Sequence, residues 1–250
     1  MVDGELRVGT SGWQYRSWRG PFYEGAPVGS WLERYAERFA TVEVNSSFYR
    51  LPERHTVRDW AAATPDGFCF SLKVSRYLSH IRRLRDPAEP IDRFLDRACR
   101  LGPKLGVALL QLPPDLQVDV DRLAGVLERW PRQVRLAVEL RHPSWFVDRV
   151  HELLAERSVA LVRTDRRGRP QEPGWVTADW CYVRLHEGRA SPVPCYGDRA
   201  LGSWIDRVHE GWGTHADGFA YFNNDGRACA PRDAARFAEL AARRGQAVRS

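Results

Sequence analysis

The chain has 250 residues, of which 43% are hydrophobic, and a formal net charge of +6. This length suits one α/β barrel domain, and the apolar content supplies a core without disulfide or metal staples. No apolar run approaches the length of a membrane span, so the composition argues against a membrane-spanning class. Met1–Glu5 also lacks the basic and then apolar pattern of a secretory signal.

Five cysteines are scattered along the chain without a C-x-x-C pair. An odd, unpatterned set in a chain of this length is typical of reduced thiols, so we expect no disulfide and a cytoplasmic location. The basic charge is almost entirely arginine, because Lys73 and Lys104 are the only lysines. Genome composition can produce this bias, so overall basicity is weak support for nucleic-acid binding.

Strand and helix patterns alternate along the chain. Strands are predicted at Leu6–Thr10, Thr41–Asn45, Phe68–Ser75, Val107–Leu112, Leu136–Arg141, Ala160–Asp165, Cys181–His186 and Phe219–Asn223. Helices are predicted at Ser30–Phe39, Val57–Ala63, Ile91–Leu101, Asp121–Trp130, Val147–Arg157, Leu201–Glu210 and from Pro231 onward. Ser30 and Glu33 form a capping-box pattern, and Pro231 suits a first helical position. No helix is evident from Arg166 to Ala178.

Eight strands with intervening helices predict a parallel sheet, and eight is the number that closes a TIM-like (β/α) barrel. No linker or composition break divides the sequence. We therefore predict a single barrel domain over residues 1–250.

Five of these strands alternate apolar and polar residues. Period-two alternation pairs Glu43 with Asn45, Glu139 with Arg141, and Arg184 with His186 on shared faces. In a barrel these groups would point inward near the carboxyl ends of the strands, where barrel enzymes place their chemistry. A buried ion network would also account for them, because an unpaired buried charge costs several kcal/mol.

Several segments in chain order resemble one known family. They are Gly9–Tyr15, Trp18–Gly20, Thr41–Pro52, Phe70–Lys73, Leu105–Pro114, Val138–Trp145, Tyr182–His186 and Tyr221–Asp225. Together they are similar to the YecE-like family, known as domain of unknown function 72. The resemblance implies a TIM-barrel-like fold and supplies no reaction. One departure is His186-Glu187-Gly188, where the family usually has His directly followed by Gly.

We interpret the polar strand faces as a candidate site. The candidate catalytic residues are Glu43, Lys73, Glu139 and His186. The candidate ligand-binding residues are Trp13, Tyr15, Asn45, Tyr49, His80, Gln111, Arg141, Arg184 and Asn223. Two carboxylates on different strands can act as acid and base if their environments separate their pKa values. A carboxylate pair near Trp13, Trp18 and Trp145 is also typical of glycoside hydrolysis.

Other chemistries stay open. His80, His142 and His186 could ligate a metal, with Glu43, Glu139 and Asp165 as possible oxygen ligands. No H-x-H spacing supports this, and we expect a metal-free site. Lys73 could form a Schiff base if burial lowered its pKa, although pairing with a carboxylate is the simpler interpretation. No cofactor motif is present in the sequence, and the cofactor stays unknown.

Two arginine-rich loops define a candidate recognition surface. They hold Arg76, Arg82, Arg83, Arg85, Arg166, Arg167 and Arg169, with Tyr77 and Trp175 among the nearby aromatics. Arginine with exposed aromatics suits phosphates and stackable rings, and merely solvated loops would look the same. Our leading hypothesis is an enzyme, possible hydrolases included, acting on an anionic, phosphate-bearing ligand. The rivals are a nucleic-acid-binding or nuclease-like barrel and a non-catalytic small-molecule binding barrel.

Overall fold

The computed structural model describes residues 4–215 and 217–250. The prediction that the amino terminus carries no signal rests partly on residues 1–3, which lie outside the described residues. The chain divides into two compact units. Unit 1 comprises the residues up to Glu43 together with Arg163–Gly174 and Asp179–Ser250, and unit 2 comprises Val44–Val162 and Trp175–Ala178. Each unit is described by itself below.

Unit 1 is built on parallel strands. Its strands are β1 (Leu6–Ser11), most of β2 (Thr41–Val44), β7 (Arg163–Arg166), β8 (Arg169–Pro170), β9 (Trp180–Leu185), β10 (Asp217–Phe222) and β11 (Val248–Arg249). Its helices are α1 (Trp31–Ala36), α7 (Asp198–Trp212) and α8 (Cys229–Ala242), with 3₁₀ turns at Arg16–Trp18, Val28–Ser30 and Gly226–Ala228. Parallel pairing joins β2, β1, β10, β9 and β7 in that order, and β11 pairs with β1.

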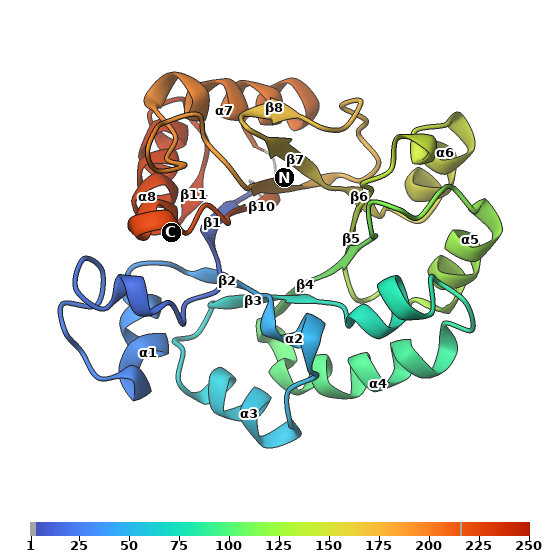
Figure 1. Cartoon of the computed structure of the whole chain (residues 1–250), viewed down its shortest axis with the longest axis horizontal. Coiled ribbons are helices and arrows are strands. Elements are labelled where there is room, and N and C mark those ends of the chain that lie inside the picture. The colour runs from blue at the N-terminus through green and yellow to red at the C-terminus, as the bar shows by residue number, and fades with distance from the viewer. Residues whose placement is uncertain (1–3, 216) are drawn as a thin grey trace. The chain divides into compact units, whose positions relative to one another are not determined.

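Unit 2 repeats strand and helix in regular alternation. Its strands are β3 (Cys69–Lys73), β4 (Leu105–Gln111), β5 (Leu136–Glu139) and β6 (Ala160–Leu161), which pair parallel in chain order. Its helices are α2 (Ser46–Tyr49), α3 (Arg54–Ala62), α4 (Ala88–Ala98), α5 (Val120–Arg129) and α6 (Asp148–Glu156). Shorter turns lie at Tyr77–Ile81, which is a π-helix, and at Cys99–Lys104 and Pro143–Trp145. Figure 1 shows α3 to α6 on the outer side of this curved set of strands.

Helical periodicity explains how the helices cover the strands. In unit 2, α4 buries Ile91, Phe94 and Ala98, which recur at helical spacing on one face. In unit 1, α8 buries Ala234 and Phe237 in the same way and lies against β1 and β10 (Figure 1). The apolar side chains on one face of each strand therefore pack against the helices, and the polar side chains lie on the opposite face.

The fold class is confirmed as α/β with a mostly parallel sheet. Closure into a complete eight-stranded barrel and the single-domain organisation stay predictions. The absence of a helix after the sixth predicted strand is confirmed, because Arg163–Arg166 turns back through the antiparallel hairpin to β8. None of the helices in residues 4–215 and 217–250 is long and apolar enough to cross a membrane.

Two details of helix capping were predicted wrongly. The Ser30 hydroxyl donates to the carbonyl of Pro27 and makes no cap bond to the helix that follows. Pro231 is the third residue of α8 rather than the first, because the chain already turns helical at Cys229. The start of α1 is nevertheless where it was predicted, since Ser30 occupies the N-cap position, and only the start of α8 is misplaced, by two residues.

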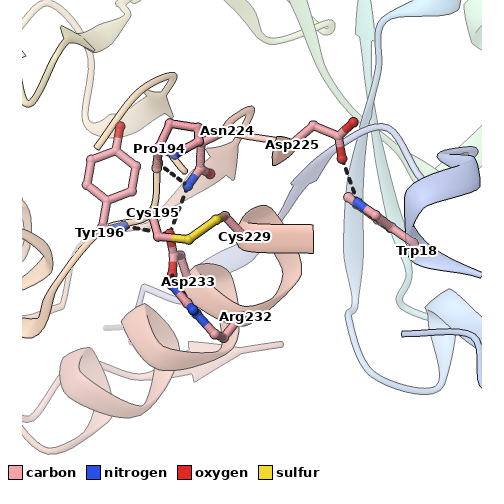
Figure 2. Close-up of a disulfide and its surroundings, with 9 residues drawn as sticks. All are labelled: Trp18, Pro194, Cys195, Tyr196, Asn224, Asp225, Cys229, Arg232 and Asp233. Atoms are coloured by element: carbon pink, nitrogen blue, oxygen red, sulfur yellow. Dashed lines mark hydrogen bonds and ion pairs between the residues drawn. A yellow bond between two sulfur atoms is a disulfide. The ribbon is translucent and has the colours of Figure 1, made fainter. Parts of the chain in front are cut away.

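A disulfide corrects the prediction of five reduced thiols. Cys195, in the loop before α7, is bonded to Cys229 at the start of α8, and the two Cα atoms lie 5.2 Å apart. Figure 2 shows the bond beside the buried carboxylate of Asp233, which accepts from the backbone N–H of Tyr196 and from the Asn224 amide. Cys69, Cys99 and Cys181 are free thiols. The pairing joins positions 34 residues apart, and no local spacing motif signals it.

Candidate functional site

The structure divides the predicted site residues between the two units. Unit 1 holds Trp13, Tyr15, Glu43, Arg184, His186 and Asn223. Unit 2 holds Asn45, Tyr49, Lys73, His80, Gln111, Glu139 and Arg141. A four-residue site combining Glu43, Lys73, Glu139 and His186 stays a prediction, since two of these residues belong to each unit.

The centre of the polar face in unit 1 is a buried ion pair. Glu43 ends the part of β2 in this unit, and Arg184 lies on β9, with side chains 0% and 1% exposed. The guanidinium Nε donates to Oε2 at 2.9 Å and NH2 donates to Oε1 at 2.7 Å. This two-point geometry is the strong form of an arginine–carboxylate pair.

Two hydroxyls complete the surroundings of Glu43. Tyr182 donates to Oε2 and Ser11 donates to Oε1, both at 2.7 Å. Burial by itself would raise the pKa of Glu43, but the charge of Arg184 and the bonds from Arg184, Tyr182 and Ser11 outweigh it and hold the pKa below its ordinary value. Glu43 is therefore an ionised anchor for Arg184 at neutral pH and has little capacity to donate a proton.

Tyr15 lies beside this anchor. Its hydroxyl donates to the Ser11 carbonyl at 2.5 Å. Burial, and then the negative charges of Asp225 and Glu43, raise the pKa of Tyr15 to about 12. The phenol is thus neutral at physiological pH and can act only as a hydrogen-bonding group.

His186 and Asn223 are also brought together in unit 1. The Asn223 amide nitrogen and His186 Nδ1 are 3.0 Å apart, and the His186 backbone N–H donates to Asp165. Asp165 additionally accepts from the Tyr196 hydroxyl at 2.6 Å. Burial raises the pKa of Asp165 even though these bonds oppose the shift. This second network fixes the exit of β9.

Unit 2 places Lys73 at the end of β3. Its side chain is buried, and its Nζ lies 4.1 Å from the centre of the Phe48 ring. The Ser47 hydroxyl donates to the Lys73 carbonyl at 2.7 Å, so α2 holds the strand end in place. A cation over an aromatic face is stabilised by the ring quadrupole.

Glu139 at the end of β5 has partners on two sides. Oε1 accepts from the Gln111 amide at 2.9 Å and from Arg141 Nε at 2.8 Å. The strand register brings Gln111 and Glu139 opposite each other. The Glu139 side chain is 2% exposed, whereas that of Arg141 is 36% exposed, so this ion pair reaches the surface.

His80 is the titratable group with the most unusual surroundings in unit 2. Its ring packs edge-on against Phe48 with centres 4.9 Å apart, and Nδ1 lies 2.9 Å from the Ser79 hydroxyl. Burial, followed by the positive charges of Lys73, Arg141 and Arg76, lowers the pKa of His80 to about 4. The imidazole is therefore neutral at pH 7 and available to accept a proton.

Asn45 and Tyr49 belong to the same end of unit 2. Asn45 precedes α2 and Tyr49 is its last residue. The side-chain oxygen of Asn45 is buried without a hydrogen-bond partner in the described part of the chain. The Tyr49 side chain is 73% exposed. We call Asn45, Phe48, Lys73, His80, Gln111, Glu139 and Arg141 the strand-end cluster.

The tryptophans do not supply open sugar-binding faces. Trp13, Trp18 and Trp145 are 4%, 0% and 0% exposed. The Trp18 indole N–H donates to Asp225 (Figure 2), and that of Trp145 donates to the Leu116 carbonyl. All three rings are buried core residues, and the N–H groups of Trp18 and Trp145 are satisfied, so the rings are not available for the stacking expected of a glycoside hydrolase.

The two arginine-rich loops differ in how their guanidinium groups are placed and paired. In unit 1, Arg166, Arg167, Arg169 and Arg189 line a cavity of about 920 Å³. The two turn residues Arg167 and Gly168 both have positive φ, 51° and 66°, which is the geometry of a tight hairpin turn. In unit 2, Arg83 is bonded to Asp115, and Arg82 forms an ion pair with Asp86. Of these two loops, the unit 1 loop places three of its own arginines on one cavity, whereas the unit 2 loop places Arg76 alone on the cavity beside it.

Several functional neighbours were missed from the sequence. Tyr182 lies on the same strand face as Arg184, so period-two alternation contained the signal. Ser11 is only small and polar at a strand end, which is not distinctive. Among residues 4–215 and 217–250, no group of three His, Cys, Asp or Glu side chains is arranged to hold a metal ion.

Comparison with known proteins gives a consistent result. Residues 7–250 match the family described as "Protein of unknown function DUF72". The UPF0759 protein YecE of Escherichia coli K12 is 33% identical over 129 residues, covering 51% of this chain and 47% of that protein. The UPF0759 protein YunF of Bacillus subtilis is 24% identical over 193 residues, covering 72% of this chain and 64% of that protein. The matched part of the chain thus spans about half of the length of YecE.

Solved structures agree with the fold. A DUF72 family protein from Thermotoga maritima has a TM-score of 0.83 at 25% identity, covering 94% of this chain and 98% of its own. A DUF72 family protein from Enterococcus faecalis has a TM-score of 0.80 at 20% identity, covering 95% of both chains. With a family match from residue 7 to the last residue, the chain belongs to the DUF72 family of proteins of unknown function.

Proposed function

We propose that this protein is an enzyme that binds an anionic, phosphate-bearing ligand at the strand-end cluster of unit 2 and acts on it by acid/base chemistry. The observation that carries the proposal is the set of cationic groups, Lys73, Arg76 and Arg141, that surround His80. They act on a half-buried imidazole at the carboxyl ends of parallel strands, where α/β proteins commonly bind ligands.

The proposed roles follow from the groups present. Lys73 and Arg141 neutralise the anion, since guanidinium and ammonium groups are the usual phosphate partners. His80 is neutral at pH 7, and a bound anion would offset the positive charges that lower its pKa, which would make the imidazole basic enough to accept a proton. Gln111 and Arg141 orient Glu139, which serves as the second acid/base group. The buried amide oxygen of Asn45 can accept a hydrogen bond from the ligand.

The candidate residues of unit 1 form a separate set, with their own proposed roles. Glu43 holds Arg184 through paired hydrogen bonds, and its lowered pKa makes it a charge-stabilising group rather than the acid predicted from sequence. His186 stays a candidate proton carrier, with Asn223 as the group that orients its ring. Trp13 is buried in unit 1, so its ring offers no open face for a ligand.

A ligand screen by thermal unfolding tests the proposal. Phosphate esters should raise the melting temperature of the wild-type protein, because a ligand that binds only the folded state stabilises it. Lys73→Met and Arg141→Gln should each reduce that rise, whereas the exposed Arg132→Gln in the same unit should not. Equal rises in the wild type and all three variants would show that the ligand does not bind at the strand-end cluster. No rise with any phosphate ester would show that the ligand class is wrong.

The nucleic-acid alternative has its own supporting observation. Four arginines and one glutamate, Glu187, line the unit 1 cavity, and Arg166 and Arg169 have no ion-pair partner among the described residues. Such a surface fits a phosphate backbone. Binding of single-stranded oligonucleotides should then weaken steeply with salt and be reduced by Arg166→Gln with Arg169→Gln. Absent or salt-independent binding would exclude this alternative.

A non-catalytic small-molecule binding protein is the third candidate, and it predicts ligand stabilisation without turnover in any assay. We also propose that the strands close into a complete eight-stranded barrel and that the protein is cytoplasmic. An experimental structure tests the first, and cell fractionation tests the second.

A further inference from the structure

A groove in unit 2 adjoins the strand-end cluster. It has a volume of about 1070 Å³ and is bounded by the end of α2, the exit of β3 and the outer face of α4. Residues from these segments that matter for the argument are Tyr49, Arg50, Leu51, Arg76, Tyr77 and Ile81. The volume is of the size that a small organic ligand occupies.

The charges on the groove walls are of two kinds. Arg54 donates to Asp96 through two hydrogen bonds of 3.0 Å, and Arg97 donates to the same carboxylate, so Asp96 offsets one of these two positive charges. Arg50 and Arg76 have no ion-pair partner in the residues that the structure describes. Glu53 and Asp92 also line the groove, so five arginines face three carboxylates and the lining carries a net charge of +2, which favours an anion.

The groove also exposes apolar surface. The side chains of Tyr49, Ile81 and Tyr77 are 73%, 58% and 37% exposed. They make up half of the six large apolar side chains found exposed in the described residues. A gathered apolar patch beside unpaired arginines is characteristic of a binding site rather than of ordinary surface.

Aromatic contacts connect the groove to the strand-end cluster. Tyr49 packs edge-on against Phe48 with ring centres 5.0 Å apart. Phe48 in turn contacts His80 and carries Lys73 Nζ over its face. Arg76 both lines the groove and contributes to the low pKa of His80. The groove and the cluster are therefore neighbours that share Phe48 and Arg76.

We infer that the ligand is a phosphate ester that carries a flat aromatic ring, with the phosphate at the strand-end cluster and the ring in the groove against Tyr49. This inference rests on the proposed function and deepens it. An aromatic ring stacked on tyrosine satisfies the exposed apolar surface, while Arg76 and Lys73 meet the phosphate. A nucleoside monophosphate is the simplest compound of this class.

Calorimetric titration of the whole chain with three probes tests the inference. The probes are inorganic phosphate, ribose 5-phosphate and adenosine monophosphate. Stacking on one aromatic side chain contributes about 1–3 kcal/mol, so the nucleotide should bind about tenfold more tightly than ribose 5-phosphate. Tyr49→Ala should remove that tenfold advantage, and Tyr49→Phe should keep it. Val147→Ala, an exposed apolar position outside the groove lining, is the matched control.

The outcomes separate the two claims. If phosphate and ribose 5-phosphate bind but the nucleotide gains nothing, or if Tyr49→Ala leaves its affinity unchanged, the inference about the ring is overturned and the proposed function stands. If the nucleotide binds through Tyr49 while Lys73→Met has no effect on any probe, the phosphate position at the cluster is wrong. If none of the three probes binds, both claims fall.

Discussion

Two glutamates with the same sequence pattern have very different surroundings. Glu43 is the next-to-last residue of β2 and Glu139 is the last residue of β5, and each follows a valine on the polar phase of its strand. Glu43 is paired to an arginine that is 1% exposed and accepts from two further hydroxyls. Glu139 is paired to an arginine that is 36% exposed. The first ion pair is enclosed within unit 1, and the second reaches solvent in unit 2.

This difference separates an anchor from a site. An enclosed pair must be fully hydrogen-bonded, because removing two charges from water is expensive. The Glu43 network meets that demand within unit 1 and leaves its carboxylate little freedom to titrate. An ion pair with one exposed partner contributes less to stability, and a ligand can approach it. The strand-end cluster is therefore the better place to look for chemistry.

The largest effect expected from this comparison is on stability in unit 1. Arg184→Met should lower the free energy of unfolding by about 3–5 kcal/mol, because it leaves the Glu43 carboxylate buried without its charge partner. Adding Glu43→Gln should recover part of the loss. Urea unfolding followed by circular dichroism measures both. A loss under about 1 kcal/mol would mean that the pair is no more than a surface-type ion pair.

The disulfide gives the next largest effect. Cys195→Ser together with Cys229→Ser should lower the free energy of unfolding by about 2–4 kcal/mol, since the cross-link restricts the unfolded chain. A reducing agent should lower the stability of the wild-type protein and leave the double variant unchanged. Cys99→Ser, at an exposed free thiol, is the control. Mass spectrometry that finds all five thiols free in the purified protein would contradict the bond.

Arg141→Gln should have a small effect on stability and a large one on binding. Its ion pair with Glu139 is partly exposed, so the loss of unfolding free energy should stay within about 1 kcal/mol. Affinity for a phosphate ester should nevertheless fall about tenfold, since a charge-assisted hydrogen bond is lost. Unfolding and titration on the same preparation measure both values. A stability loss as large as that of Arg184→Met would erase the contrast between the two glutamates.

The smallest effect is a titration. His80 should titrate near pH 4 in the folded protein by NMR, against about 6.5 in the unfolded chain. Between these pH values the unfolded chain binds a proton that the folded protein does not, so stability should fall as pH drops from about 6.5 to about 4. His80→Gln should remove this slope. Lys73→Met should raise the pKa of His80, and Arg132→Gln should leave it unchanged. A folded-state pKa near 6.5 would show that the cluster is not strongly cationic.

Local pattern predicted the elements of the fold well. All eight predicted strands correspond to strands in the structure, although the sixth is divided into β6 and β7. Alternation and helical spacing are local properties, so they are legible in the chain. The start of α1 after Ser30 was correct, whereas α8 begins two residues before Pro231. The π-helix at Tyr77–Ile81 and the four-residue α2 were missed because short elements carry little periodicity.

The sequence determined which residues are polar, on which strands and in which phase. That was enough to name Glu43, Arg184, Lys73, His80 and Glu139. Only the tertiary structure decided their partners, because a strand-end carboxylate meets whichever side chain the neighbouring strand and loop deliver. It enclosed Glu43 with Tyr182 and Ser11, joined Cys195 to Cys229, and left Arg141 open to solvent. Burial and pairing depend on contacts far apart in the chain, and these set pKa values, stability and access.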